Sequence, residues 1–142
     1  MSEVNIVFCK NNILKIEKIL HLNEFYNTHI EGDVIPYILM INGIIEGFAL
    51  ILKKELKLCS FCINPKYHNQ NIGFMFYIFI ERKLKNKYIN QNFEIILESK
   101  FDKIKFYQKC GFKITGSVIN CFNYLNEEIE IYSMSKYIKY LE

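Results

Sequence analysis

Apolar residues recur along the chain with two alternating periods, one typical of strands and the other of helices. Residues 4–8 alternate between apolar and polar side chains, which predicts a half-buried first strand. Residues 13–20 carry apolar side chains at helical spacing, and Asn11 or Asn12 can cap that predicted helix. The polar stretch 24–33 is irregular and is compatible with a short second helix.

Three strands are predicted in the next part of the chain. Residues 36–41 and 44–53 are apolar runs joined by Asn42-Gly43, a dipeptide that strongly favours a two-residue hairpin turn. A further apolar run, residues 56–63, predicts the strand that follows.

The second half of the chain alternates helices with strands. The pattern predicts helices at 72–87 and 102–110, and strands at 93–98, 112–119 and 128–137. The most apolar run, 72–80, is far shorter than the roughly 20 residues that cross a bilayer, so it predicts a buried helix and no membrane association. The order of the elements predicts an α/β (α+β) fold in a single domain, residues 1–142.

Composition and charge narrow the function classes only a little. The hydrophobic content of 51% is ample for one buried core in a chain of 142 residues. The net charge is +3, the basic residues are scattered lysines, and Arg82 is the only arginine. Sequence readout of nucleic acid favours clustered arginine, so nucleic acid is not expected as a partner.

Cysteine usage and the N-terminal residues indicate a reducing compartment. The first residues lack a basic region followed by an apolar core, so no secretory signal is expected and the chain is predicted to be cytoplasmic. The five cysteines are then expected to be free thiols. Cys59 and Cys62 form a C-x-x-C, but residues three apart on a strand point to opposite faces, and no second ligand pair completes a metal site.

Residues 63–73 connect a predicted strand to a predicted helix. A connection of this kind aims unpaired backbone N–H groups and the positive end of a helix dipole at one point, so an anionic ligand is expected there. Asn71 is of the non-glycine type that best tolerates a left-handed backbone and can supply the turn. His68 can donate a hydrogen bond to phosphate, with a pH dependence.

The same loop resembles the acyl-CoA loop of the GNAT superfamily of N-acetyltransferases at Pro65, Tyr67, Ile72 and Gly73. Two positions depart from the family pattern, since His68 replaces the usual Arg or Gln and Asn71 replaces the first glycine. The resemblance implies that this loop and the end of the preceding strand bind acetyl-CoA as co-substrate. The residues expected to contact it are Phe61, Cys62, Ile63, His68, Asn69, Gln70, Asn71, Ile72, Gly73 and Phe74.

A second motif lies downstream, where residues 95–112 read as a strand, a short helix and the helix-ending Gly111. Its end resembles the F-Y-x-K-x-G-F segment of the same superfamily, in which the tyrosine lies beside the thioester sulfur. Tyr107 occupies that position. A tyrosine hydroxyl stays protonated at neutral pH and can donate a proton to a departing thiolate, so Tyr107 is the expected catalytic acid.

An attacking amine must also lose a proton, and Glu98 is the expected catalytic base because it ends the predicted strand 93–98. Some family members carry Glu in the strand before the loop where this chain has Lys57, which puts that variant of the mechanism in doubt. A water relay is an alternative, as are three other side chains, His68, Glu46 and Glu55.

The resemblance implies a GNAT-like mixed, largely antiparallel central sheet of six to seven strands, flanked by about four helices. It also implies transfer of an acetyl group from acetyl-CoA to a primary amine. The segment 95–112 resembles eukaryotic glucosamine-6-phosphate N-acetyltransferases, which favours an aminosugar phosphate as acceptor. A protein or peptide amine is the rival, and non-catalytic acyl-CoA binding is a third alternative. The sequence leaves open whether the chain forms a homodimer.

Overall fold

The computed structural model describes residues 6–10, 34–68, 70–116, 119–122 and 125–140. The helix expected at 13–20 and the stretch 24–33 lie outside these residues, and so does Asn69. Within them the expected order of strands and helices is largely confirmed. None of the described helices is both long and apolar enough to span a membrane.

The first four described strands form an antiparallel half-sheet. Their bounds are β1 Ile6–Lys10, β2 Val34–Ile41, β3 Ile44–Leu52 and β4 Lys57–Ile63. Strand β2 pairs with β1 on one edge and with β3 on the other, and β3 pairs with β4. The turn between β2 and β3 has positive φ at both Asn42 and Gly43, which is the geometry of the predicted hairpin.

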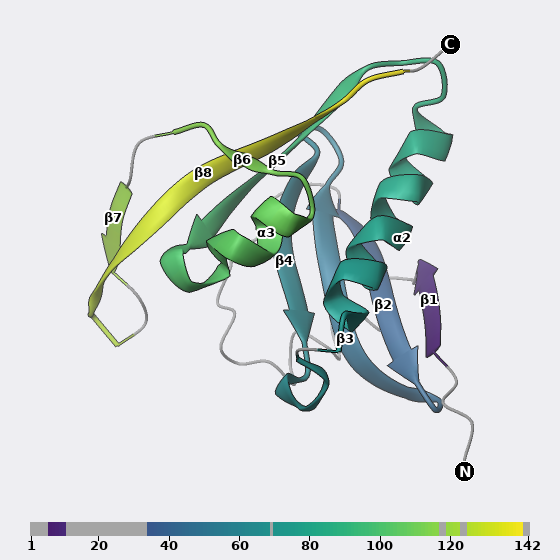
Figure 1. Cartoon of the computed structure of the whole chain (residues 1–142), viewed down its shortest axis with the longest axis horizontal. Coiled ribbons are helices and arrows are strands. Elements are labelled where there is room, and N and C mark those ends of the chain that lie inside the picture. Colours follow the sequence, from purple (N-terminus) through teal and green to yellow (C-terminus); the bar gives the residue numbers. More distant parts are fainter. Residues whose placement is uncertain (1–5, 11–33, 69, 117–118, 123–124, 141–142) are drawn as a thin grey trace.

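The second half-sheet is built on β5 (Phe93–Lys100) and β8 (Glu128–Ile138), which pair antiparallel over the whole of β5. The two halves meet where β4 and β5 run parallel, and this ladder has only two pairs, Lys57 with Ile96 and Leu58 with Leu97. Beyond these pairs both strands continue but diverge, as Figure 1 shows. We call the region after Leu58 and Leu97 the fork.

The single strand predicted at 112–119 is wrong. Two short strands, β6 (Lys113–Ile114) and β7 (Ile119–Phe122), pair with successive parts of β8. The ladder is interrupted because the backbone N–H groups of Thr115 and Gly116 both point to the carbonyl of Ser133, so two residues oppose one, as in a bulge. Among the described residues the main order of the sheet has seven strands, β1-β2-β3-β4-β5-β8-β6, as expected, and β7 pairs with β8 off that order.

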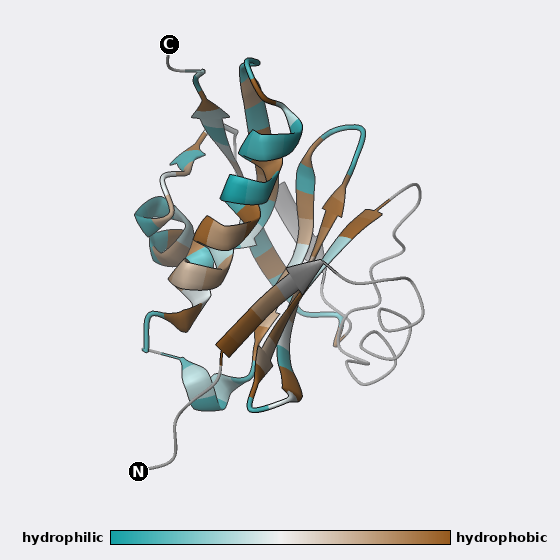
Figure 2. Ribbon diagram, turned by 90° about the vertical axis from the view of Figure 1, so that its right-hand side faces the viewer, coloured by the Kyte–Doolittle hydropathy of each residue, from teal (hydrophilic) through white to brown (hydrophobic). Residues whose placement is uncertain are grey.

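In the part of the chain that the structure describes, two α-helices, α2 (Ile72–Lys87) and α3 (Ile104–Lys109), cover one face of the sheet (Figure 2). The buried positions of α2 recur at helical spacing, at Ile72, Phe76, Tyr77, Ile80, Glu81 and Leu84. Except for Glu81, they join the main hydrophobic core with β-strand residues such as Ile95 and Leu97. We call this the helix face. The opposite face, the second face, has a smaller core of Ile38, Phe48 and Leu50.

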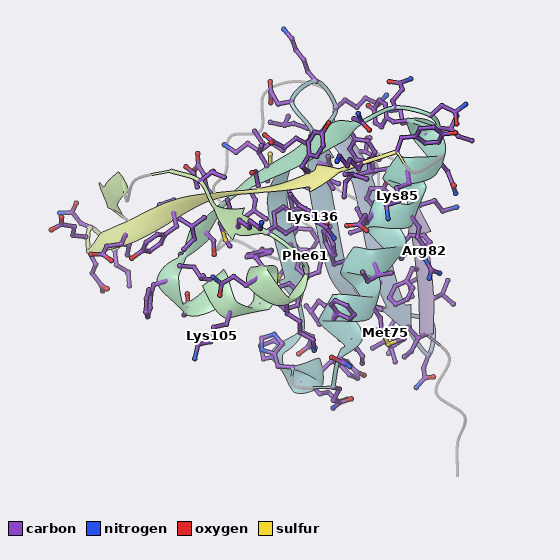
Figure 3. The ribbon with its side chains drawn as sticks, turned by 45° about the horizontal axis from the view of Figure 1, so that its top comes forward. Phe61, Met75, Arg82, Lys85, Lys105 and Lys136 are labelled. Atoms are coloured by element: carbon purple, nitrogen blue, oxygen red, sulfur yellow. The ribbon has the colours of Figure 1, made fainter. Side chains whose placement is uncertain are left out.

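A buried ionic network fastens α2, α3 and β8 together. The Glu81 carboxylate, buried on α2, accepts hydrogen bonds from the Tyr77 hydroxyl at 2.9 Å and from the Lys136 ammonium. Lys136, which Figure 3 shows between β8 and α2, also donates to the carbonyl of Cys110 at the end of α3, 2.7 Å away. Gly111 follows with φ +102°, and a Cβ there would lie 2.8 Å from Cε of Lys136. A side chain at Gly111 would therefore displace Lys136.

The charge of Glu81 makes this network pH-dependent. Burial raises the pKa of the Glu81 carboxyl, but hydrogen bonds from Lys136, Tyr77 and Lys85 outweigh that effect and hold the pKa below its ordinary value. A carboxyl with a lowered pKa in the folded state stabilises the fold at neutral pH. That stabilisation is lost as the pH falls through the lowered pKa.

We predict that Lys136→Met lowers the free energy of unfolding by about 3 kcal/mol, because it leaves a buried carboxylate without its main cation. Urea unfolding at neutral pH measures the loss. Lys85→Met is the matched control: Lys85 also contacts Glu81, at 3.1 Å, but its side chain is half exposed, so its loss should cost less than about 1 kcal/mol. If both variants lost the same free energy of unfolding, Lys136 would not be the main partner of the Glu81 carboxylate.

Candidate functional site

The fork exposes one edge of β4 to a possible ligand. Backbone groups of successive strand residues point to alternate edges. The carbonyl of Cys62 faces β3, where a Cβ on Gly47 would lie 2.8 Å from it. The N–H and C=O of Phe61 therefore face the fork. Of the three strand residues expected to offer backbone groups to a ligand, Phe61 fits and Cys62 does not.

The backbone of Ile63 also faces the fork, but its carbonyl is already bonded. Nε2 of His68 lies 2.9 Å from that oxygen and must donate to it. His68 was expected to point its ring at a phosphate. Instead this ring nitrogen fastens the loop to the end of β4, which leaves only Nδ1 to meet a ligand.

The loop turns into α2 at Asn71 as expected. Asn71 has φ 63° and ψ 3°, a left-handed conformation, and its side chain makes no capping hydrogen bond to the helix. The first N–H groups of a helix have no acceptor within the helix, so those of Ile72, Gly73 and Phe74 point out of the N-terminus. Gln70 is exposed, and its side-chain amide returns to the carbonyl of Lys66 at 3.4 Å. This is an anion-binding geometry.

Gly73 has a role in packing as well as its place in the loop. A Cβ on Gly73 would lie 3.2 Å from Cδ1 of Ile63 and 3.2 Å from Cε1 of Phe106. The glycine thus allows the start of α2 to approach both β4 and α3. Substituting Gly73 would disturb that contact along with any ligand.

Lys109 brings a positive charge to the same place. Its ammonium, at the end of α3, donates to Oδ1 of Asn71 and lies 5.1 Å from the ring centroid of Phe74. A cation beside a helix N-terminus is unfavourable unless an anion joins them. The docking of α3 against α2 brings Lys109 to this position.

Tyr107 lies on the helix face, beside the fork. Its half-buried ring meets that of Phe61 at a centroid distance of 6.5 Å and that of Phe112 at 6.0 Å. The contact with Phe61 places Tyr107 against the strand whose backbone faces the fork. This agrees with the expected position of the catalytic acid and leaves its chemical role a prediction.

Glu98 borders the fork from the second face. Leu97 and Ser99 are buried on β5 while Glu98 between them is exposed, so its side chain points away from the helices. Oε1 of Glu98 accepts a hydrogen bond from Nζ of Lys57 at 3.2 Å, and both side chains are partly exposed. Tyr107 and Glu98 therefore flank the fork from opposite faces of the sheet.

The alternative bases are less well placed. Glu46 is held by Asn64, whose amide donates to Oε2 at 2.8 Å. Glu55 is exposed in the turn between β3 and β4, at the far end of β4 from the loop. No group of three or more His, Cys, Asp or Glu that could hold a metal ion occurs among the described residues.

Comparison with known proteins identifies the family. The sequence matches the family described as Acetyltransferase (GNAT) domain over residues 7–134, so the chain belongs to the GNAT acetyltransferases. No curated protein matches it by sequence. The expected resemblance is thus confirmed, and the chain is an acetyltransferase that uses acetyl-CoA.

Solved structures share the fold at low identity. The ribosomal-protein-S18-alanine N-acetyltransferase of Escherichia coli is 14% identical, with a TM-score of 0.77 and 97% of each chain covered. A GNAT acetyltransferase of Elizabethkingia anophelis with acetyl-CoA bound is 15% identical, with a TM-score of 0.67 over 94% of this chain and 99% of that one. Arabidopsis thaliana NAA60 is 12% identical, with a TM-score of 0.72 over 95% and 100%.

We predict that Lys109→Met raises the Kd for acetyl-CoA about tenfold, because it removes a charge-assisted contact to phosphate. Calorimetry at low and at moderate salt measures the change, which should shrink as salt screens the charge. Lys105→Met is the control, since Lys105 is an exposed lysine of the same helix that points outward in Figure 3. If both variants weakened binding equally, general charge and not the position of Lys109 would be responsible.

Proposed function

We propose that the protein acetylates a small primary amine that also carries an anionic group, with glucosamine 6-phosphate as the representative acceptor. The observation that supports this most is the partly exposed ion pair of Lys57 and Glu98 beside the fork. An acceptor with an ammonium and a phosphate can exchange partners with such a pair, so that each charge of the acceptor meets its opposite.

Acetyl-CoA would bind on the helix face. Its pyrophosphate meets the free N–H groups at the start of α2 and the ammonium of Lys109. Its pantetheine arm runs along the fork edge of β4, where the N–H and C=O of Phe61 pair with its amides. The thioester then lies near Tyr107, whose ring contacts Phe61.

The acceptor would approach from the second face, where Glu98 lies. The neutral amine nitrogen attacks the thioester carbonyl carbon, so that a C–N bond forms as the C–S bond breaks. Glu98 takes the proton lost by the nitrogen and later releases it to solvent, while Tyr107 gives its proton to the thiolate and regains one from solvent. The products are the acetamide and coenzyme A.

A protein or peptide amine is the second candidate. Two structures that share the fold are, by their descriptions, an S18-alanine N-acetyltransferase and NAA60 with a bisubstrate analogue. A peptide N-terminus offers an ammonium but need not offer an anion, so it would use Glu98 and have no need of Lys57. A panel of glucosamine 6-phosphate, spermidine and a peptide with N-terminal alanine, assayed by thiol release from acetyl-CoA, separates the candidates.

We predict that Tyr107→Phe lowers kcat by about 10²-fold and leaves the Kd for acetyl-CoA within about twofold, since the variant loses only the proton donor. Steady-state kinetics and calorimetry on the same preparation measure both. Tyr88→Phe is the control, because Tyr88 caps the C-terminal end of α2 and the proposed site lies at the N-terminal end. This variant should keep the parent kcat. An unchanged kcat in Tyr107→Phe would show that Tyr107 is not the proton donor and that water protonates the thiolate.

We also predict that Glu98→Gln and Lys57→Met change different kinetic parameters. Glu98→Gln should lower kcat/KM about 10²-fold for every amine, because the base is lost. Lys57→Met should raise the KM of glucosamine 6-phosphate about tenfold and leave that of unphosphorylated glucosamine unchanged. Lys53→Met, in the exposed turn before β4, should change neither. Equal KM changes for both sugars in Lys57→Met would refute the anionic acceptor.

A further inference from the structure

Ser60 carries a buried hydroxyl for which the fold provides no partner. The residue is 5% exposed, and its Oγ is the one buried side-chain N or O atom of the described residues that lacks a hydrogen-bond partner. The other two buried polar side chains in this part of the chain are bonded: Glu81 to Tyr77 and to lysines, and Ser99 to the carbonyl of Lys100 at 2.8 Å.

A bulge in β4 decides where this hydroxyl points. In the β3–β4 ladder Leu58 pairs with Ile51 and Ser60 pairs with Leu50, so Cys59 is an extra residue. Because of that extra residue, Ser60 lies on the same face as Lys57, three positions earlier. Residues paired across strands share a face, and Leu50 belongs to the second-face core. Ser60 thus points to the face that carries Glu98.

Ser60 also lies beyond the last pair of β4 with β5. The ladder ends at Leu58 and Leu97, so Ser60 follows Leu58 by two residues on one side of the fork and Glu98 follows Leu97 by one on the other. The hydroxyl and the carboxylate therefore occupy the same face on the two strands that border the fork.

Leaving a buried hydroxyl unbonded costs stability, and an alanine of similar shape would avoid that cost. A polar atom kept without a partner in the protein alone is explained most simply by a partner that arrives with a ligand. The neighbouring side chains of the second face, Leu50 and Cys62 among them, offer an apolar lining in which such a bond would be strong.

We propose that the Ser60 hydroxyl binds the acceptor amine, accepting a hydrogen bond from its nitrogen while Glu98 takes the proton that is lost. This rests on the proposed acetyl transfer and adds a residue that selects and orients the acceptor. The amine reaches Ser60 through the fork, where β5 no longer covers the edge of β4. Ser60 makes no covalent bond in this step.

The test compares Ser60→Ala with the matched control Ser99→Ala, a buried serine on the helix face whose hydroxyl is bonded. Each variant is examined by urea unfolding, by calorimetry with acetyl-CoA, and by kinetics with glucosamine 6-phosphate and with a peptide bearing N-terminal alanine. Ser60→Ala should keep or raise the urea midpoint, keep the Kd for acetyl-CoA, and raise the KM of the acceptor about tenfold. Ser99→Ala should lower the midpoint and leave the acceptor KM unchanged.

Two results would overturn the assignment of Ser60 alone. One is a parent-like acceptor KM in Ser60→Ala. The other is a fall in its urea midpoint as large as that of Ser99→Ala, which would show that the hydroxyl is bonded within the fold. If the parent protein binds acetyl-CoA but releases no thiol with any amine of the panel, the proposed function itself fails, and the role of Ser60 falls with it.

Discussion

The early end of the parallel ladder between β4 and β5 is the constraint on which the site depends. Among the described strands every other neighbouring pair is antiparallel, and β5 is paired with β8 along its whole length. Beyond Leu58 and Leu97 the pairing of β4 with β5 ends, and both strands continue without pairing to each other. Buried backbone groups need partners. A ligand that brings its own amides, such as the pantetheine arm of coenzyme A, satisfies that need.

The sheet divides the chemistry between its two faces. The helix face holds the groups suited to the cofactor: the start of α2, the ammonium of Lys109 and the ring of Tyr107. The second face holds Glu98 with Lys57, and the bulge at Cys59 turns Ser60 to the same side. In the proposed function, cofactor and acceptor would meet through the fork without competing for the same surface. The buried network of Glu81 and Lys136 holds α3, and thus Tyr107, against the sheet.

Local patterns predicted most of the fold and failed where tertiary contacts decide. The turn at Asn42-Gly43 and the bounds of α2, residues 72–87, followed from turn chemistry and helical periodicity. The strand expected at 112–119 was broken by a bulge opposite Ser133, which no alternation pattern reveals. No local pattern reveals that Nε2 of His68 bonds the carbonyl of Ile63 at the end of β4, and the contact of His68 with phosphate stays a prediction. The contact of Lys109 with Asn71 depends on the docking of α3 against α2, which no local pattern reveals.

Amide hydrogen exchange at the fork tests the central claim most directly. Backbone groups that wait for a ligand should become protected when it binds, while amides already paired in the sheet should not change. The account predicts that acetyl-CoA slows exchange at Phe61 on β4 and at Ile72, Gly73 and Phe74 at the start of α2. It predicts no change along the β2–β3 hairpin. Binding of acetyl-CoA with protection elsewhere, and none at Phe61 or the start of α2, would contradict it.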